Sequence, residues 1–267
     1  MTMPDAAATY SNILVEAQAG VALITINREP ANTLSVATMD ELNAAFDALE
    51  KDDAVRAVVI TGAGQHVFVG GADITEFLSA LEQGADVMVR RGLDLFDRIE
   101  GFPKPVIAAV NGVCAGGGME LAMACDVRFA SENAKFGMRE VTLGIIPGWG
   151  GNQRLPRLVG RGRAMEMLLT GDWVTADAAA RSGLVNRVFP DNELLAQARN
   201  LGRKLAMSSG PIAMRLIKRS VNVGLDRGMS AGFEADLKGV DEVMKTKDAA
   251  EGVTAFLGKR RPKFVGQ

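Results

Sequence analysis

Strand-like apolar runs and a helical repeat alternate along the first part of the chain. Two short apolar runs on either side of Ala19-Gly20 predict a hairpin over residues 12–27. From Thr38-Met39-Asp40-Glu41, which has the spacing of a capping box, apolar residues recur at helical spacing and predict a helix over 38–51. The continuous apolar run at 55–61 is typical of a strand covered on both faces. Strand, helix and strand in this order predict a βαβ unit with parallel strands.

The alternation continues through the middle of the chain and then stops. A helix is predicted over residues 85–100, a strand over 106–110 and another strand over 184–189. After Pro190 no strand is predicted, and helical patterns cover residues 192–208, 211–223, 230–245 and 248–258. This succession indicates a main α/β domain followed by a helical C-terminal part, which packs on the main domain, on another subunit or on both.

Composition narrows the classes of protein that fit this pattern. The chain has 267 residues, and its net charge of −2 argues against nucleic acid as the main partner. A single histidine excludes a histidine-cluster metal site, and two cysteines outside any CxxC pair are typical of a reducing compartment. The start lacks a basic region followed by an apolar run, and no window is apolar enough to span a membrane. We therefore expect a soluble cytoplasmic enzyme or binding protein without a metal.

Glycine clusters and carboxylates gather between residues 104 and 156. Gly116-Gly117-Gly118 follows the strand at 106–110 and leads into a short apolar helix, and a second glycine-rich turn covers 147–151. Neither Gly62-Ala63-Gly64 nor the cluster from Gly112 to Gly118 fits the dinucleotide fingerprint, and the chain has no P-loop, so simple nucleotide-phosphate binding is not indicated. A backbone N–H at the start of a helix is unpaired and lies at the positive end of the helix dipole, so Gly117 is a candidate oxyanion donor.

A second donor can come from the glycine-rich loop 70–73, and two N–H groups aimed at one carbonyl oxygen would stabilise an enolate. The alternative is that the glycines only permit tight turns. Glu120 and Glu140 lie beside apolar residues, and two carboxylates in one pocket suit acid/base work, in which they titrate as a coupled pair. Taken singly, either glutamate fits better as a solvated or capping carboxylate, because most glutamates are surface residues.

Across nearly its whole length the chain resembles the crotonase (enoyl-CoA hydratase/isomerase) superfamily. The motifs that carry the resemblance are Asn27-Arg28 with the loop to Leu34-Ser35, Gly70-Gly71-Ala72-Asp73-Ile74, the segment 104–112, Gly116-Gly117-Gly118-Met119-Glu120-Leu121, Phe136-Gly137 with Glu140, Gly144-Ile145-Ile146-Pro147-Gly148, Gln153-Arg154-Leu155, and Ala255-Phe256-Leu257 with Lys259-Arg260. The resemblance implies an α/β fold: a crotonase-like spiral of repeated ββα units over residues 1–195, which carries the CoA and acyl site, and a helical C-terminal trimerisation region over 196–267.

The resemblance also implies an activity. Members with both glutamates typically add water to a trans-2-enoyl-CoA, reversibly and syn, giving a 3-hydroxyacyl-CoA through a thioester enolate. The implied oxyanion donors are the N–H groups of Ala72 and Gly117, with Glu120 taking a proton from water and Glu140 supplying one to Cα. No cofactor or metal is implied, since coenzyme A belongs to the substrate. The implied assembly is a homotrimer or a homohexamer, without nucleic acid or membrane partners, and the implied setting is fatty-acid β-oxidation.

The resemblance further assigns contacts with substrate or CoA. These positions are Arg28, Ala31, Gly70, Gly71, Asp73, Ile74, Gly116, Pro147, Gly148, Phe256 and Lys259. Lys259 and the basic residues beside it would meet CoA phosphates from a neighbouring subunit, although a solvated tail explains them equally well. Asp73 is expected to hold the oxyanion loop in place rather than to perform chemistry.

Two departures from the family pattern and several other functions stay open. Arg139 stands where the pattern often has proline, so its charge either shifts the pKa of Glu140 or points away. Trp149 stands where a small residue is common, so its ring either shortens the acyl pocket or packs outside it. The alternatives are another CoA-enolate reaction (isomerisation or a specialised catabolic hydration), a non-catalytic paralogue that binds acyl-CoA or RNA, and, remotely, a Rossmann dehydrogenase.

Overall fold

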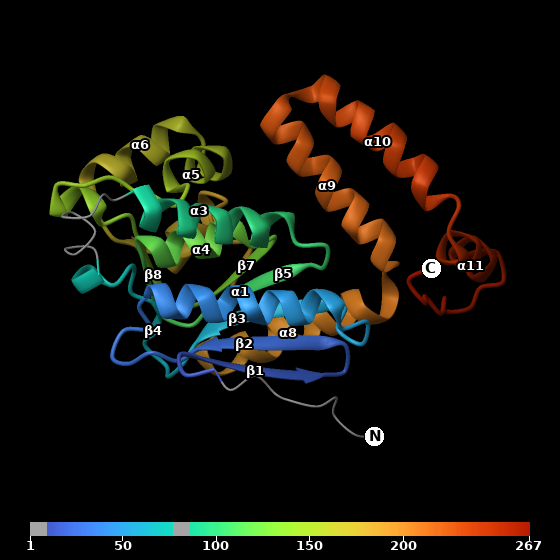
Figure 1. Cartoon of the computed structure of the whole chain (residues 1–267), viewed down its shortest axis with the longest axis horizontal. Helices are drawn as coiled ribbons and strands as arrows, with labels where there is room; N and C mark the ends of the chain where they lie inside the picture. The colour runs from blue at the N-terminus through green and yellow to red at the C-terminus, as the bar shows by residue number, and fades with distance from the viewer. Residues whose placement is uncertain (1–9, 77–85) are drawn as a thin grey trace.

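The continuous apolar runs form the central strands of a six-stranded sheet, as Figure 1 shows for the computed structural model, which describes residues 10–76 and 86–267. The order in this sheet is β1-β2-β3-β5-β7-β10; β1 and β2 form the predicted antiparallel hairpin, and the remaining pairs are parallel. Its strands are β1 (Ile13–Gln18), β2 (Val21–Ile26), β3 (Ala57–Gly62), β5 (Val106–Val110), β7 (Val127–Ser131) and β10 (Arg187–Phe189).

A second sheet of short strands lies at the carboxyl ends of the long ones. Its order is β4-β6-β8-β9, with β4, β6 and β8 parallel and β9 antiparallel to β8. The strands are β4 (Val67–Val69), β6 (Val113–Ala115), β8 (Lys135–Gly137) and β9 (Val174–Thr175). Three successive strand pairs, β3–β4, β5–β6 and β7–β8, therefore each place one strand in each sheet before a helical segment follows. This repetition is the predicted spiral of ββα units.

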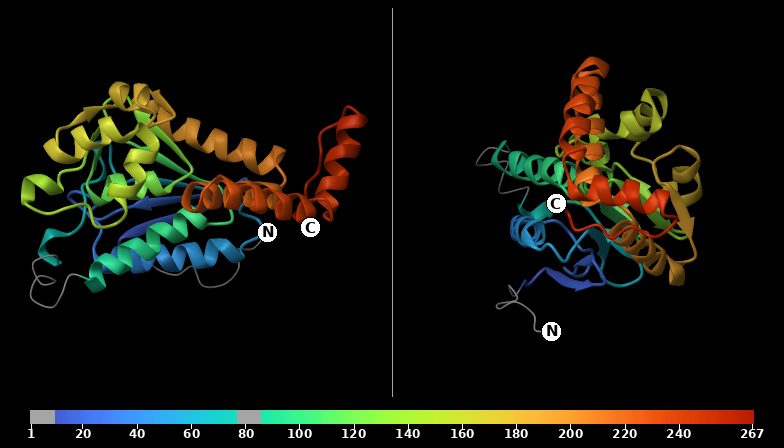
Figure 2. Two further views of the ribbon diagram at one scale, coloured as in Figure 1. Left: turned by 90° about the horizontal axis from the view of Figure 1, so that it is seen from above. Right: turned by 90° about the vertical axis from the view of Figure 1, so that its right-hand side faces the viewer.

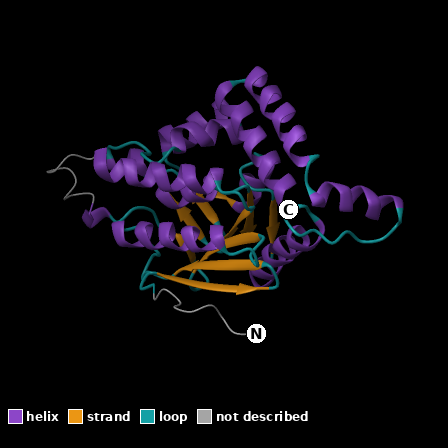
Figure 3. Cartoon of the chain, turned by 45° about the vertical axis from the view of Figure 1, so that its right-hand side comes forward, coloured by secondary structure: helices purple, strands orange, loops and turns teal. Residues whose placement is uncertain are grey.

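Helices cover both faces of the six-stranded sheet (Figure 3). The spiral contains α1 (Val36–Lys51), α3 (Asp86–Gly101), α4 (Gly117–Ala124), the 3₁₀ helix η1 (Glu140–Leu143), α5 (Gly151–Val159), α6 (Arg161–Thr170) and α7 (Ala176–Arg181). The side chains of each strand alternate between two cores, so Ile24 and Ile60 face the large core with α1 and α3, whereas Leu23 and Val59 face a smaller one. Burial on both faces explains why these strands are apolar without interruption.

The last helices differ in how they pack. They are α8 (Asp191–Ser208), α9 (Pro211–Arg227), α10 (Met229–Val243) and α11 (Lys247–Leu257), and all four were predicted. α8 closes the smaller core through Leu194 and Ala198. The helices α9 and α10 form a hairpin that extends away from the sheets, and α11 projects beyond it (Figure 2). The predicted division of the chain at residue 195 stays a prediction, and α8 runs across this position.

Three sequence predictions differ locally from the structure. Helix α1 begins at Val36, because the Ser35 side chain caps it by accepting a hydrogen bond from Thr38 N–H at 3.1 Å; a capping box starting at Thr38 is wrong. The predicted strand 55–61 runs from 57 to 62. The strand at 184–189 is confined to Arg187–Phe189, because the N–H groups of Leu184 and Val185 bond to the carbonyl of Ala179 instead of a neighbouring strand.

Candidate active site

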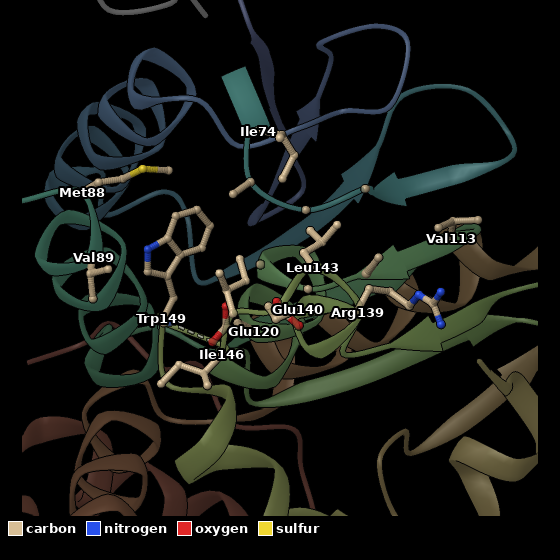
Figure 4. Close-up of a pocket in the computed structure, with 18 of the residues that line it drawn as sticks. Ile74, Met88, Val89, Val113, Glu120, Arg139, Glu140, Leu143, Ile146 and Trp149 are labelled. Carbon is tan, nitrogen blue, oxygen red and sulfur yellow. Dashed lines mark hydrogen bonds between the residues drawn. The ribbon is translucent and has the colours of Figure 1, made fainter. Parts of the chain in front are cut away.

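One cavity of about 410 Å³ lies where the turns of the spiral meet (Figure 4). Its wall comes from the loop after β4, from α3, from the junction of β6 and α4, from η1, and from the turn before α5. Residues at the carboxyl ends of parallel strands thus converge on one space, as is usual for ligand sites in α/β folds. Its volume is within the range of small-molecule sites.

Two backbone N–H groups converge on this cavity. Gly117 is the first residue of α4, so its N–H has no partner within the helix and lies at the positive end of the dipole. Ala72 and Leu34 form an isolated parallel β-bridge. The backbone of Leu34 bonds to Gly71 and Asp73, on either side of Ala72, so the N–H of Ala72 points away from Leu34. A Cβ at position 117 would lie 3.5 Å from Ala72 N. The two predicted donors are therefore neighbours in space.

Glu120 is buried in the first turn of α4, with 2% of its surface exposed. Its Oε1 accepts hydrogen bonds from Trp149 N–H at 2.8 Å and from Gly151 N–H at 2.7 Å, at the start of α5. Burial raises the pKa of Glu120 from 4.5 to about 7; the nearby charge of Glu140 adds to this rise, whereas the two backbone N–H groups oppose it. A carboxyl with a pKa near neutrality exists in both protonation states at physiological pH, as acid/base catalysis requires.

Glu140 is the first residue of η1 and lies near Glu120 in the cavity (Figure 4). Its Oε2 is buried and receives no hydrogen bond from the described residues. Burial also raises the pKa of Glu140. A Cβ at position 116 would lie 2.6 Å from Glu140 Oε1, and Gly116 has φ of +49°, so both space and backbone conformation require glycine there.

The loop that carries Ala72 is held from two sides. Asp73 accepts hydrogen bonds from Thr75 N–H and Oγ1–H and forms an ion pair with Arg28 at 2.5 Å. The hydrogen bond from the Thr75 side chain is the largest cause that lowers the pKa of Asp73. On the other side, Gly70 N–H donates to the carbonyl of Ala31 at 2.9 Å. Asp73 and Arg28 therefore position the loop, as expected for Asp73.

Arg139 points away from Glu140 (Figure 4). Its guanidinium lies 5.3 Å from the centre of the Trp173 ring and donates to the carbonyl of Gly171. It is not among the groups that shift the pKa of Glu140. Arg139 and Trp173 form one end of the cavity wall, and the charge of Arg139 does not act on the carboxyl beside it in the sequence.

The opposite end of the cavity is apolar and includes Trp149. Met88 and Val89 of α3 contribute to it together with Ile146, and the Trp149 ring is buried. Sequence reasoning identified Trp149 as a departure from the family pattern but missed Met88, Val89 and Ile146 as wall residues. The only signal in the sequence was their apolar character, which they share with core residues.

The structure brings most of the predicted site residues together. Those that line the cavity are Gly70, Gly71, Ala72, Ile74, Gly116, Gly117, Glu120, Glu140 and Gly148. Arg28, Ala31, Asp73 and Pro147 are not in its lining. Arg28 and Ala31 contact the loop 70–73 through Asp73 and Gly70, and the carbonyl of Pro147 accepts a hydrogen bond from Asn152. Phe256 and Lys259 lie in and just after α11, on the projecting C-terminal part (Figure 2), and do not line the cavity of their own chain.

In residues 10–76 and 86–267, no group of three or more His, Cys, Asp or Glu side chains is placed to hold a metal ion. No helix in these ranges has the length and apolarity needed to cross a membrane.

Comparison with known proteins identifies the family. Residues 16–267 match the family described as enoyl-CoA hydratase/isomerase. The chain belongs to the enoyl-CoA hydratase/isomerase family. Two curated members are a crotonyl-CoA hydratase of Syntrophomonas wolfei, 46% identical over 97% of this chain and 99% of that protein, and a short-chain-enoyl-CoA hydratase of Clostridium acetobutylicum, 41% identical over 94% and 96%.

A solved member of the family has the same fold. The crystal structure of an enoyl-CoA hydratase from Bacillus anthracis superimposes with a TM-score of 0.92 at 40% identity, covering 96% of this chain and 100% of that one. The resemblance to the crotonase superfamily and the spiral fold are thereby confirmed. The roles of individual residues in the enoyl-CoA hydratase/isomerase site stay predictions.

Proposed function

We propose that the protein is an enoyl-CoA hydratase that reversibly adds water, syn, across the double bond of a trans-2-enoyl-CoA to give a 3-hydroxyacyl-CoA. The observation that carries this proposal is the meeting of the buried Glu120, the partly buried Glu140 and two backbone N–H groups in one cavity. Two relatives that align with this chain over nearly their whole length are named as hydratases of short enoyl-CoA substrates, which supports the proposal.

The two N–H groups stabilise the charge that develops on the substrate. The thioester oxygen accepts hydrogen bonds from Ala72 N–H and Gly117 N–H, so the negative charge of the enolate is held by fixed donors rather than by reorganising water. The positive end of α4 adds to this stabilisation. The enolate formed by attack of water on Cβ is therefore lowered in energy relative to the enoyl thioester.

The surroundings of the two carboxyls support a division of roles between them. Glu120 accepts two backbone N–H groups, which favour its ionised form, so it takes the proton of the attacking water. Glu140 has a buried oxygen that receives no donor from the described residues, which suits a neutral carboxylic acid that delivers its proton to Cα. Water thus contributes OH to Cβ and a proton to Glu120, and Cα gains the proton of Glu140. Exchange of protons with a further water restores the pair.

Hydration of crotonyl-CoA tests this proposal directly. The purified protein is expected to remove the absorbance of the enone thioester, and Glu120→Gln and Glu140→Gln are each expected to lower kcat by about 10²–10⁴. Binding of butyryl-CoA, which cannot be hydrated, should stay within about threefold of wild type in both variants, since neither amide changes the cavity size. Absence of hydration with enoyl groups of every length would disprove the proposal.

The same assay separates the alternatives left by the sequence. An isomerase would convert a 3-enoyl-CoA to its 2-enoyl isomer without forming a hydroxyl group, so chromatography of the products distinguishes the two reactions. A catalytically silent paralogue would bind acyl-CoA without product. The two glutamates in one cavity favour the hydratase over both.

Cofactor use, location and metabolic setting follow the same proposal. Carboxyls and backbone N–H groups supply both proton transfer and oxyanion stabilisation, so we expect turnover without a metal or a cofactor beyond the CoA of the substrate. Both cysteines, Cys114 and Cys125, are buried free thiols, which supports a cytoplasmic location. Fatty-acid β-oxidation stays a prediction.

The C-terminal helices support an assembly of several chains. The α9–α10 hairpin exposes an apolar stripe made of Ile217, Val221, Leu225, Phe233, Leu237, Val240 and Met244, each more than half exposed. Soluble single chains rarely expose apolar patches of this extent. A homotrimer or homohexamer would bury the stripe, and it would allow Lys259 to approach the CoA of a neighbouring chain.

A further inference from the structure

Trp149 closes the apolar end of the cavity. Its side chain spans two glycines: a Cβ at Gly117 would lie 2.4 Å from the ring atom Cζ3, and a Cβ at Gly92 would lie 2.3 Å from Nε1. Gly117 carries one of the oxyanion donors, and Gly92 belongs to α3 on the far side of the ring. The indole therefore fills the space between the reacting end of the cavity and α3.

Gly92 has no role in the backbone that explains its presence. It lies inside α3, where glycine is the poorest helix former after proline, and its φ is not positive. The space it leaves is occupied by the edge of the Trp149 ring. Gly92 and Trp149 are thus a matched pair, in which the missing side chain of one accommodates the large side chain of the other.

The indole is also fixed in place. Its ring packs edge-to-face against Phe96, with centres 5.7 Å apart and planes at 89°. The backbone is held on both sides of the residue: Trp149 N–H donates to Glu120, and its carbonyl accepts from Arg154 Nη1 at 3.0 Å. The hydrogen bonds fix the backbone of Trp149, and rotation of the ring about its side-chain bonds would break its packing on Phe96. The indole therefore forms a firm wall.

We propose that Trp149, seated against Gly92, limits the site to short 2-enoyl groups. The proposal rests on the proposed function, because it takes the thioester oxygen to lie between Ala72 and Gly117. An acyl chain that leaves this point passes the two carboxyls and then meets the indole, which already contacts Gly117. The wall residues Met88 and Val89 border the same end. A chain longer than crotonyl would have to extend into the space that these side chains occupy.

The test compares chain lengths in one enzyme and its variant. The kcat/KM for crotonyl-CoA and for trans-2-decenoyl-CoA is measured for wild type and Trp149→Ala. The ratio of the decenoyl to the crotonyl value should rise at least about tenfold in Trp149→Ala, because methylene groups accepted by a pocket change kcat/KM by factors of this size. A ratio within about twofold of wild type, with crotonyl-CoA still hydrated, would overturn the proposal.

Trp173→Ala is the matched control, because Trp173 is the only other tryptophan of the chain and lines the opposite end of the same cavity. Its decenoyl-to-crotonyl ratio should stay within about twofold of wild type. If Trp149→Ala does not fold, Trp149→Leu is measured by the same criterion.

A double-mutant cycle, measured as melting temperatures, tests the pairing of Gly92 with Trp149. Gly92→Ala places a methyl group against the indole and should lower the Tm of wild type, but it should raise or preserve the Tm of Trp149→Ala, where the ring is absent and alanine favours the helix. An equal loss of Tm in both backgrounds would contradict the pairing.

Binding separates this proposal from the hydratase proposal. Dissociation constants of butyryl-CoA and decanoyl-CoA, which undergo no hydration, are measured by calorimetry for wild type and Trp149→Ala. A relative gain of about tenfold or more for decanoyl-CoA supports the limit on length even if no enoyl-CoA is hydrated, in which case only the proposed function fails. An unchanged ratio of the two constants overturns the limit on length.

Discussion

Glu120 occupies surroundings that are costly for a carboxylate and useful for a base. The chain removes it from water, places Glu140 opposite and offsets part of the cost with the N–H groups of Trp149 and Gly151. Burial therefore dominates, and the pKa of Glu120 rises to about 7. The native state consequently holds a proton on this carboxyl between pH 4.5 and about 7, where the unfolded chain has already lost it.

The pH dependence of stability follows with a definite sign. Because the native state binds more protons in this window, the contribution of Glu120 to the free energy of unfolding falls as pH rises from about 4.5 to about 7. Glu120→Gln removes this titration, so the variant should gain stability relative to wild type as pH rises, by up to about 3 kcal/mol at pH 8. Urea unfolding at pH 5 and pH 8 measures the difference. The substitution Glu132→Gln, at an exposed position, is the control. A difference in the free energy of unfolding between Glu120→Gln and wild type that does not widen from pH 5 to pH 8 would contradict the raised pKa of Glu120.

The meeting of the carboxyls and glycines in one cavity was largely predictable from single residues, whereas the walls of the cavity were not. Glu120, Glu140 and Gly117 lie within one stretch of sequence whose glycines and carboxylates are unusual for a surface, so the pattern indicated a site. Met88 and Val89 are ordinary apolar residues of a helix. Only the path of the chain, which brings α3 against the turn before α5, turns them into part of the cavity.

At the scale of elements, the turn that holds Glu120 depends on a contact between α3 and α5. Arg154 of α5 is 6% exposed and donates to the carbonyl of Trp149. The same guanidinium bonds to Asp97 at 2.6 Å and to Glu100 at 2.8 Å, both on α3. One side chain thus ties two helices to the turn, and its planar fork of donors suits three acceptors better than an ammonium group does.

Arg154→Lys is therefore expected to lower the free energy of unfolding by roughly 1–3 kcal/mol, since lysine cannot serve all three acceptors. Arg157→Lys is the matched control on the same helix, because Arg157 forms an exposed ion pair with Asp226 and its replacement should change stability by less than about 0.5 kcal/mol. Denaturant midpoints of the two variants measure the contrast. Equal effects would show that Arg154 does not join the helices.

Element positions were predictable to within a few residues, and the errors have local causes. The start of α1 was misplaced because several residues near it can cap a helix, and the choice of Ser35 depends on backbone geometry. The segment before β10 is apolar because Leu184 and Val185 are buried in the core, which resembles a strand in sequence although the backbone bonds elsewhere. Apolar character shows burial more directly than it shows backbone pairing.

At the scale of the whole molecule, the C-terminal hairpin combines close internal packing with an exposed apolar stripe. The helices α9 and α10 approach each other closely at Gly224 and Gly232, where a Cβ at position 232 would lie 3.0 Å from the opposing Cα. The hairpin is thus well packed internally but leaves its apolar stripe uncovered. The sequence predicted these helices and an assembly, but an amphipathic pattern by itself does not reveal which face a partner covers.

Leu237→Asp should convert the assembled protein into single chains, because a carboxylate at the centre of an apolar contact would be buried without a partner. Lys238→Asp, one residue further along α10 and away from the stripe, is expected to leave the assembly intact. Light scattering coupled to size-exclusion chromatography measures both masses. A wild-type protein that runs as a single chain would refute the assembly itself.

The pairing of Gly92 with Trp149 also restricts the order in which related sequences can change. A side chain at position 92 has no room while the indole is present, so that position can vary only after position 149 has become smaller. In the reverse direction, an ancestor with a larger residue at position 92 could acquire tryptophan at 149 only after glycine had appeared. Evolution between narrow and wide sites would therefore pass through an intermediate with small residues at both positions, and that intermediate would accept substrates of mixed length.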